Sequence, residues 1–297
     1  MKICLSCRYR FEADGWRCPK CGEEPPVRNG VICFAPELDA RDGDFPPESF
    51  SRLAELEEGH FWFRNRNRLI VWALKRYAPD ASRFLEIGCG TGHVLRAVWR
   101  ARPDLQVCGA DLHTSGLVIA QQRLSETTLY QLDARRIPFE GEFDVVGAFD
   151  VIEHVDEDDV VLGQMYRALS PGGVLMLTLP QHPFLWSHVD EYSRHKRRYT
   201  RTELRAKVEE AHFHVVFLTS FISILFPLML LRRMTRHGSE QETDPGRELR
   251  IHGYLNAFFK GCVAVERFLI RRGVSLPFGG SLFLVGRKPG VRSRGNL

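Results

Sequence analysis

The chain has 297 residues, of which 44% are hydrophobic and 26% charged, and these values are ordinary for a globular enzyme with a sizeable core. Its formal net charge of +4 does not by itself indicate a nucleic-acid partner. Met1 and Lys2 run directly into cysteine-rich sequence, without the apolar run of a secretory signal. The eight cysteines are therefore expected to be intracellular thiols or metal ligands, not a disulfide framework, and we predict a cytoplasmic protein.

Four of the cysteines form two CxxC pairs near the N-terminus. Cys4 and Cys7 make the first pair, and Cys18 and Cys21 make the second, each in a turn-like context. Two such pairs supply the four soft ligands of a tetrahedral zinc ion to a segment too short for a core of its own. We therefore expect a structural zinc ribbon over residues 1–35. A redox role is the alternative, and it is disfavoured because there are two pairs and no βαβ context.

The rest of the chain divides by its apolar pattern. Residues 36–80 begin as a Pro- and Asp-rich linker and continue with apolar residues at helical spacing. Residues 81–219 alternate strand-like and helix-like stretches, which predicts an α/β fold with a mostly parallel sheet and helices on both faces. Residues 220–276 are an apolar helical insertion, and residues 277–297 hold a last strand and a tail. Ligands of such sheets bind at the carboxyl ends of the strands.

A glycine-rich turn follows the first strand of the α/β region, in "FLEIGCGTGHVL". Its glycines, Gly88, Gly90 and Gly92, are spaced G-x-G-x-G, whereas a dinucleotide site requires G-x-G-x-x-G. Glu86 precedes them, and its carboxylate would repel a pyrophosphate but would suit a ligand that carries an ammonium group. The turn lets the backbone approach a bound amino-acid moiety, whose carboxylate the helix N-terminus can meet.

Two further acidic residues end the next two strands. Asp111, followed by Leu112, lies about 20 residues past the glycine turn, where adenosine-binding sheets bind the ribose hydroxyls. Asp133, followed by Ala134, is placed to meet the exocyclic amine of adenine. Together with Glu86, these positions predict S-adenosylmethionine (SAM) rather than NAD as the cofactor.

Residues 84–180 resemble the class I SAM-dependent methyltransferases. The resemblance rests on "LEIGCGTG", "GADL", "LDA", "FDVVGAFDVIEHV" and "LSPGGVLMLTLP", which occur in the family's order and spacing. It implies a Rossmann-like sheet of seven strands. The upstream "HFWFRNRNRLI" is similar to small-molecule members, including quinone methyltransferases, in which an arginine meets the methionine carboxylate of the cofactor. Arg68 or Arg64 would be that residue here, and the aromatic residues of this stretch would pack the helix or contact the cofactor.

Methyl transfer is an in-line displacement at an activated sulfonium carbon, so the protein chiefly aligns the reactants and excludes water. A general base is needed only where the acceptor must lose a proton. In the loop after the fourth strand, we expect Asp150 to contact the cofactor, and Glu153 and His154 to open the next helix. The alternative, implied by similar loops in quinone methyltransferases, is that these three residues hold a divalent ion.

The segment after the fifth strand, "QHPFLWSHVDEYSRHKRRYTRTEL", is expected to cover the acceptor pocket. Histidines and aromatic residues interleave here with Lys and Arg, and His188 or His195 is the expected general base. Thr200 to Glu203 fit a helix capping box. The basic side chains ahead of that helix predict a site for a phosphate or carboxylate of the acceptor, with a solvated charged surface as the alternative.

About sixty residues separate the expected sixth and seventh strands. Their first apolar run is about 17 residues long and partly needed as a strand, so a membrane-spanning helix is not expected. Two apolar helices with basic ends would form a lid over an apolar acceptor, a peripheral contact with the inner membrane face, or a homodimer interface. In the membrane option, lipid head groups would meet Arg232, Arg233, Arg236, Arg271 and Arg272.

These features predict a methyltransferase that acts on an O or N of a small-molecule or lipid-like, optionally anionic, acceptor. The alternative is an RNA methyltransferase that uses the ribbon for RNA recognition, because ribosomal RNA guanine methyltransferases have a similar arrangement. The cysteine spacing, the low net charge and the apolar insertion disfavour it. A SAM-binding regulator without catalysis has no positive support. We also expect the ribbon to be independent of cofactor binding. Removing both Cys18 and Cys21 should therefore unfold the ribbon but leave SAM binding intact.

Overall fold

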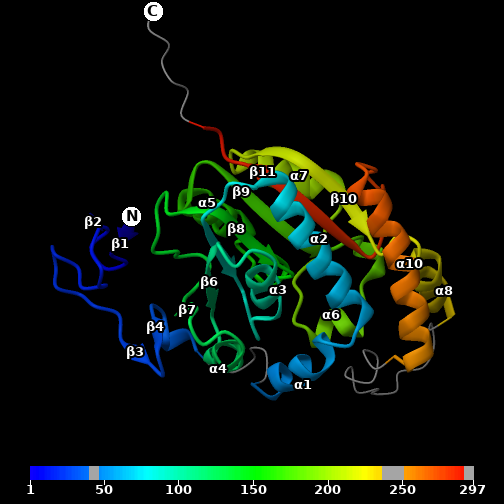
Figure 1. Ribbon diagram of the computed structural model, residues 1–297, viewed down its shortest axis with the longest axis horizontal. Helices are drawn as coiled ribbons and strands as arrows, with labels where there is room; N and C mark the ends of the chain where they lie inside the picture. The colour runs from blue at the N-terminus through cyan, green and yellow to red at the C-terminus, as the bar shows by residue number, and fades with distance from the viewer. Residues whose placement is uncertain (40–46, 236–250, 291–297) are drawn as a thin grey trace, which may run out of the picture.

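The computed structural model describes residues 1–39, 47–235 and 251–290 (Figure 1). In these ranges nine strands form one sheet, in the order β10-β11-β9-β8-β5-β6-β7-β4-β3. Their bounds are β3 Val27–Arg28, β4 Val31–Cys33, β5 Arg83–Ile87, β6 Gln106–Asp111, β7 Thr128–Gln131, β8 Phe143–Phe149, β9 Leu169–Pro180, β10 His214–Phe221 and β11 Ser281–Arg287. A separate antiparallel pair consists of β1 Lys2–Ile3 and β2 Arg10–Phe11.

The predicted Rossmann-like sheet is confirmed. Strands β7, β6, β5, β8 and β9 pair in parallel in that order, and β11 runs antiparallel between β9 and β10. These are the seven expected strands. Two more extend the sheet, because β4 pairs in parallel with β7 through Ile32 opposite Tyr130 and Cys33 opposite Gln131. Residues 27–33, which we had assigned to the ribbon, thus belong to the main sheet.

Helices cover both faces of the sheet (Figure 1). Their bounds are α1 Pro47–Glu57, α2 Phe61–Tyr77, α3 His93–Ala101, α4 Thr114–Arg123, α5 Asp158–Ala168, α6 His188–Tyr192, α7 Arg201–Glu210, α8 Phe226–Thr235 and α10 Gly253–Arg271, with 3-10 turns η1 Pro36–Leu38, η2 Ile152–His154 and η3 Pro183–Leu185. Phe84 and Leu85, adjacent on β5, point to opposite faces of the sheet and belong to different cores. The core with Phe84 includes α2, α3, α4 and α10, and the core with Leu85 includes α5 and α7.

The insertion between β10 and β11 supplies α8 and α10, at the far side of the sheet from the cysteine-rich segment (Figure 1). Helix α10 packs along α2, where the rings of Phe61 and Phe259 are 5.2 Å apart. Glu266 of α10 is fully buried and accepts hydrogen bonds from the backbone N–H groups of Ile222 (2.6 Å) and Ser223 (2.5 Å). These bonds hold the turn after β10 against α10. Within the described ranges, no helix has the length and apolar character needed to cross a membrane.

Candidate active site

A cavity of about 1450 Å³ opens at the carboxyl ends of β5, β6 and β8. Pockets for one ligand are typically about 300–1,000 Å³, so this cavity has room for a cofactor together with an acceptor. Its floor is formed by the glycine turn, the loops after β6, β7 and β8, and one face of α2. The insertion contributes an apolar wall that consists of Ile222, Leu225, Leu228, Met229, Ile251, Leu255 and Phe259. The cavity therefore has one polar and one apolar end.

The turn after β5 is built from glycines in left-handed conformations. Gly88 has a φ of 69°, and a Cβ at this position would lie 2.4 Å from Cγ2 of Val151, so that only glycine fits. Gly90 has a φ of 48° and lines the cavity with Gly88. Gly92 lies behind the turn against Ala120, where it is the N-cap of α3. The backbone of the turn is thus open to a ligand at Gly88 and Gly90.

Two buried carboxylates of the polar end, Glu86 and Asp111, are those predicted to bind the cofactor. Glu86 is 2% exposed, and its Oε2 has no hydrogen-bond partner among the described residues. Burial raises the pKa of Glu86 well above its usual value, although nearby Arg66 opposes the shift. Asp111 accepts hydrogen bonds from the backbone N–H groups of Gly90 (2.8 Å) and His113 (2.9 Å), and burial nevertheless raises its pKa. A buried oxygen without a partner is a place where a ligand donor fits.

The other cofactor residues predicted after β6 and β7 also line the cavity. Leu112, Asp133 and Ala134 lie there, after β6 and β7. The carboxylate of Asp133 is engaged within its own loop, because it accepts the backbone N–H of Arg135 (2.8 Å) and pairs with the Arg135 guanidinium (2.9 Å). A ligand amine at Asp133 would therefore share the carboxylate with an arginine.

Helix α2 presents Arg66, not Arg68, to the cavity. Arg68, which we expected at the cofactor, is exposed and does not line the cavity, and Arg64 is exposed as well. Arg66 lines the cavity, with a side chain only 9% exposed. It precedes the buried Leu69 and Ile70 by three and four positions, so the helical period places it on their face. This periodicity in the sequence is the signal that could have identified Arg66.

Asp150 directly follows β8 in a left-handed conformation, with a φ of 60°, which is a strained backbone for a residue other than glycine. Its carboxylate accepts hydrogen bonds from Arg66 (2.7 Å) and from Oγ1 of Thr178 (2.9 Å). The Arg66 guanidinium also lies over the ring of Trp62, 4.8 Å from its centroid. Partners on α2 and β9 thus hold Asp150 at the border between the polar and apolar ends.

A second polar cluster follows Asp150. Glu153 and His154, which we expect to open the next helix, lie instead in the 3-10 turn η2, and α5 begins only at Asp158. Both carboxylate oxygens of Glu153 are buried without a partner in the described part of the chain, and burial and Asp150 raise its pKa well above the usual value. Burial and nearby His195 lower the pKa of His154 to about 3. Glu153, His154 and His195 offer ligand atoms within 4.8 Å of one another, so these three could hold a metal ion.

The two candidate bases differ in their surroundings. Nδ1 of His195 lies 2.8 Å from Oδ1 of Asp190, whose fully buried carboxylate also pairs with Arg198 at 2.7 Å. Although burial raises it, hydrogen bonds from His195 and Arg198 hold the pKa of the Asp190 carboxyl well below its usual range. His195 lines the cavity. His188 does not line it: its side chain is 85% exposed and lies 3.0 Å from Glu191.

The basic run around α7 is largely neutralised within the protein. Asp158 is buried and lies 3.3 Å from Arg197 and 2.8 Å from Lys207. The predicted capping box is confirmed, because Oγ1 of Thr200 accepts the N–H of Glu203 at 3.1 Å. The loop therefore has fewer free cations for an anionic acceptor than its sequence suggests.

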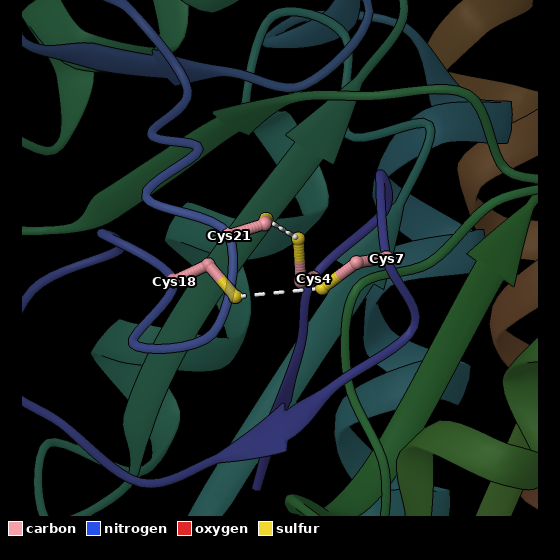
Figure 2. Close-up of side chains that lie close together, drawn as sticks. All are labelled: Cys4, Cys7, Cys18 and Cys21. Atoms are coloured by element: carbon pink, nitrogen blue, oxygen red, sulfur yellow. Dashed lines mark hydrogen bonds between the residues drawn. The ribbon is translucent and has the colours of Figure 1, made fainter.

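The four N-terminal cysteines converge, as Figure 2 shows. The Sγ atoms of Cys4 and Cys21 are 3.6 Å apart, as are those of Cys7 and Cys18, and all four lie within 4.8 Å of one another. Ligand sulfurs on a tetrahedral zinc ion are roughly 3.8 Å apart, so the arrangement fits this metal. Although burial opposes the shift, hydrogen bonds from the N–H groups of Cys21 and Lys20 lower the pKa of Cys18 to about 7. Although the N–H of Glu23 opposes it, hydrogen bonds with the Cys7, Cys18 and Cys4 thiols and burial raise the pKa of Cys21 to about 12.

Comparison with known proteins identifies the central part of the chain. A family model described as a methyltransferase domain matches residues 85–175. These residues are a class I methyltransferase domain. The ubiquinone biosynthesis O-methyltransferase of Psychrobacter arcticus is 34% identical over 108 residues, which cover 33% of this chain and 41% of the relative. The malonyl-[acyl-carrier protein] O-methyltransferase of Bacillus cereus is 27% identical over 45% of this chain and 49% of the relative. The chain thus spans less than half the length of these curated relatives.

A solved structure supports the fold of the methyltransferase domain over more of the chain. Phosphoethanolamine N-methyltransferase 2 of Haemonchus contortus, solved in complex with S-adenosyl-L-methionine, aligns with 89% of this chain and 62% of its own. The TM-score is 0.55 and the sequence identity is 23%. The methyltransferase domain and the elements around it therefore share the fold of that enzyme.

Proposed function

We propose that this protein is a SAM-dependent methyltransferase that methylates an O or N of a small, apolar or lipid-like acceptor. The observation that carries the proposal is a single cavity with two unlike ends. Buried carboxylates and an open glycine turn form one end, and apolar side chains of the insertion form the other. A charged amino-acid cofactor suits the first end, and an apolar acceptor suits the second.

The polar end fits SAM, which supplies an activated methyl group when it is bound. The partnerless oxygen of Glu86 would accept a hydrogen bond from the ammonium group, and Asp111 would hold the ribose. We propose Arg66, rather than Arg68, as the arginine beside the methionine portion, because Arg66 lines the cavity and Arg68 does not. The proposed cofactor set is Arg66, Glu86, Gly88, Gly90, Asp111, Leu112, Asp133, Ala134 and Asp150.

The apolar end supports an acceptor with a hydrophobic body. Phe61 and Phe259 approach each other across α2 and α10, and Leu225 and Met229 of the β10–α8 region continue the same wall. Burying apolar ligand surface here contributes roughly 25 cal/mol per Å². The names of the two relatives given above, a ubiquinone biosynthesis O-methyltransferase and a malonyl-[acyl-carrier protein] O-methyltransferase, agree with an oxygen acceptor.

We propose His195 as the general base for an acceptor that must lose a proton. Asp190 engages Nδ1 of His195, so Nε2 is the nitrogen that would take the proton. The buried Asp190 carboxylate would stabilise the resulting imidazolium and hold the ring in place, since Arg198 fixes the carboxylate in turn. The proton would move from the attacking O or N to the imidazole as the methyl group is transferred.

For the cysteine cluster, we propose a structural zinc ion held by Cys4, Cys7, Cys18 and Cys21. The sulfur spacing fits tetrahedral coordination, and a complete set of four protein ligands leaves no open position for chemistry. The module around the cluster buries few apolar residues of its own, so metal binding would supply much of its folding free energy.

The outer face of α10 is proposed to contact an anionic lipid bilayer. Tyr254, Phe258, Val265 and Phe268 follow one side of the helix and are each more than half exposed. The one acidic residue of α10, Glu266, is buried, so this face carries no negative charge. Exposed cations on the two packed helices are Arg64 and Arg68 of α2 and Arg271 of α10, and Arg272 directly follows α10. The side chains of Arg232, Arg233 and Arg236, which we also expected at head groups, lie outside the described residues.

The proposed function is tested by incubating the protein with methyl-labelled SAM and a lysate of its source organism. The products are separated into organic-phase, aqueous small-molecule, RNA and protein fractions, with the Gly90→Val variant as the inactive control. Label in the organic phase supports the lipid-like acceptor. Label in RNA would overturn it and favour the RNA methyltransferase alternative, and no label in any fraction would contradict methyl transfer to the cell's own molecules.

A further inference from the structure

The N-terminal module is built into the edge of the methyltransferase sheet. Trp16 lies between the two cysteine pairs in the sequence, and its ring packs edge-to-face on Phe34 (4.6 Å), Phe139 (5.4 Å) and Tyr130 (5.9 Å). The backbone N–H of Ile3 donates to the carbonyl oxygen of Pro138 at 2.9 Å. The cysteine cluster packs with Trp16, so it is connected through Trp16 to Phe34, Tyr130 and Phe139 near β7.

Gln131 connects this edge to the cavity. Its side chain is fully buried; it accepts the N–H of Ala35 (3.1 Å) and donates to the Ala35 carbonyl (2.8 Å). The same amide nitrogen donates to the carbonyl of Leu112 at 2.9 Å, and Leu112 lines the cavity directly after Asp111. One glutamine thus links the segment after β4 to the backbone of the proposed ribose-binding loop.

Asp39 makes a second connection to the same loop. Its carboxylate accepts the backbone N–H of Thr114 (3.0 Å) and the Thr114 hydroxyl (2.5 Å) at the start of α4. The preceding residue, His113, donates its N–H to Asp111 at 2.9 Å. Residues 111–114 are consequently held between the cavity and the N-terminal segment, at Leu112 by Gln131 and at Thr114 by Asp39.

We propose that the N-terminal module positions residues 111–114 for the cofactor, so that filling the four-cysteine site with zinc tightens the binding of SAM. Gln131 and Asp39 are the positioning residues of this link. The inference rests on the proposed function, and it reverses the expectation that the ribbon and cofactor binding are independent. Without zinc, the module would no longer hold Trp16 and the β4 segment in place. The ribose-binding loop would then lose more conformational entropy when SAM binds, which weakens the affinity.

The first test compares Gln131→Met with Gln106→Met, a matched substitution at an exposed position of β6. Isothermal titration calorimetry measures the Kd for SAM, and steady-state kinetics measure kcat at saturating SAM. We expect the Kd of Gln131→Met to rise about tenfold, and that of Gln106→Met to stay within about twofold of wild type. An unchanged kcat in Gln131→Met would show that the substitution weakens cofactor binding without damaging the fold in general. If Gln131→Met does not fold, Asp39→Asn tests the same loop from a partly exposed side chain.

The second test removes zinc from the wild-type protein with a chelator and measures the Kd for SAM before and after Zn²⁺ is restored. A weaker Kd that Zn²⁺ reverses and Mg²⁺ does not is the expected result. Equal affinities in the zinc-loaded, zinc-free and Gln131→Met proteins would overturn the inference alone. A zinc-loaded wild-type protein that fails to bind SAM would instead overturn the proposed function.

Discussion

The guanidinium of Arg66 and the carboxylate of Asp150 form an ion pair of 2.7 Å that joins α2 to the end of β8. The pair lines the cavity, and Thr178 of β9 donates to the same carboxylate. Arg66 also opposes the burial that raises the pKa of Glu86 and of Glu153. Helix α2, which precedes β5 in the chain, therefore influences the charge balance of the site.

Replacing Arg66 by methionine should weaken SAM binding by about tenfold or more, because Asp150 and Glu86 would lose their nearby positive charge. The matched control is Arg68→Met, since Arg68 is exposed on the same helix. Its Kd should stay within about twofold of wild type. Calorimetric titration measures both values. A larger loss in Arg68→Met than in Arg66→Met would reinstate Arg68 as the cofactor arginine.

Gly90→Val should abolish measurable SAM binding. Gly90 has a φ of 48°, which a β-branched residue adopts only at a cost of about 1–2 kcal/mol, and the new side chain would project from a turn that lines the cavity. The control is Gly163→Ala, which lies within α5 with nothing within 4 Å of the added Cβ. That variant should bind SAM as wild type does. Full cofactor affinity in Gly90→Val would refute the assignment of this turn.

His195→Gln should lower kcat by about 10²–10⁴-fold with a proton-losing acceptor, while the Kd for SAM changes little. His188→Gln is the control, because its side chain is 85% exposed and outside the cavity. Initial rates at saturating cofactor and acceptor distinguish the two. Equal activity of both variants would show that His195 is not the base, and a metal-dependent rate would point to the cluster of Glu153, His154 and His195.

The buried imidazole of His93 should lower the free energy of unfolding of the protein in mild acid, compared with neutral pH. Burial, together with nearby Arg66, Arg123 and Arg96, lowers the pKa of His93 from 6.5 to about 3. As the pH falls below 6.5, the unfolded chain binds a proton that the folded protein excludes, so the free energy of unfolding decreases. Between about pH 7.5 and about pH 5.5, wild type should lose about 1.4 kcal/mol more than His93→Gln. Urea unfolding measures this difference, and equal losses would contradict a lowered pKa.

Phe258→Asp should reduce binding to anionic vesicles, because it places a negative charge in the apolar outer face of α10. Co-sedimentation with vesicles of phosphatidylcholine and phosphatidylglycerol measures binding, and pure phosphatidylcholine vesicles test the need for charge. Val118→Asp, at an exposed apolar position of α4, is the control and should bind as wild type does. A different outcome would contradict the membrane contact: the wild-type protein does not bind the vesicles but forms a dimer, and Phe258→Asp disrupts that dimer. This face would then bind a second copy of the chain.

Most of the fold could be predicted from the sequence because the relevant signals are local. The alternation of strand-like and helix-like stretches predicted the parallel sheet, and the G-x-G-x-G spacing predicted a tight turn that the structure places after β5. The boundary of the ribbon was placed too late. Strand β4 is only three residues long, and its pairing with β7 joins residues about a hundred positions apart. No local pattern predicts such a pairing.

The side chains of the site were harder to predict where several residues of one type compete. Arg64, Arg66 and Arg68 occur within five positions, and only the packing of α2 decides that Arg66 points inward. His188 and His195 lie in the same segment between β9 and α7, and the buried carboxylate of Asp190 distinguishes them because it pairs with His195.

By itself, the sequence determined the methyltransferase domain, its glycine turn, the acidic strand ends and the two cysteine pairs, because each depends on residue type and spacing along the chain. Only the tertiary structure decided that Arg66 rather than Arg68, and His195 rather than His188, line the cavity. It also decided that Gln131 and Asp39 connect the N-terminal module to the loop after β6. These features depend on hydrogen bonds and ion pairs between segments distant in sequence. Their partners become neighbours only when the sheet has assembled and the helices have packed on it.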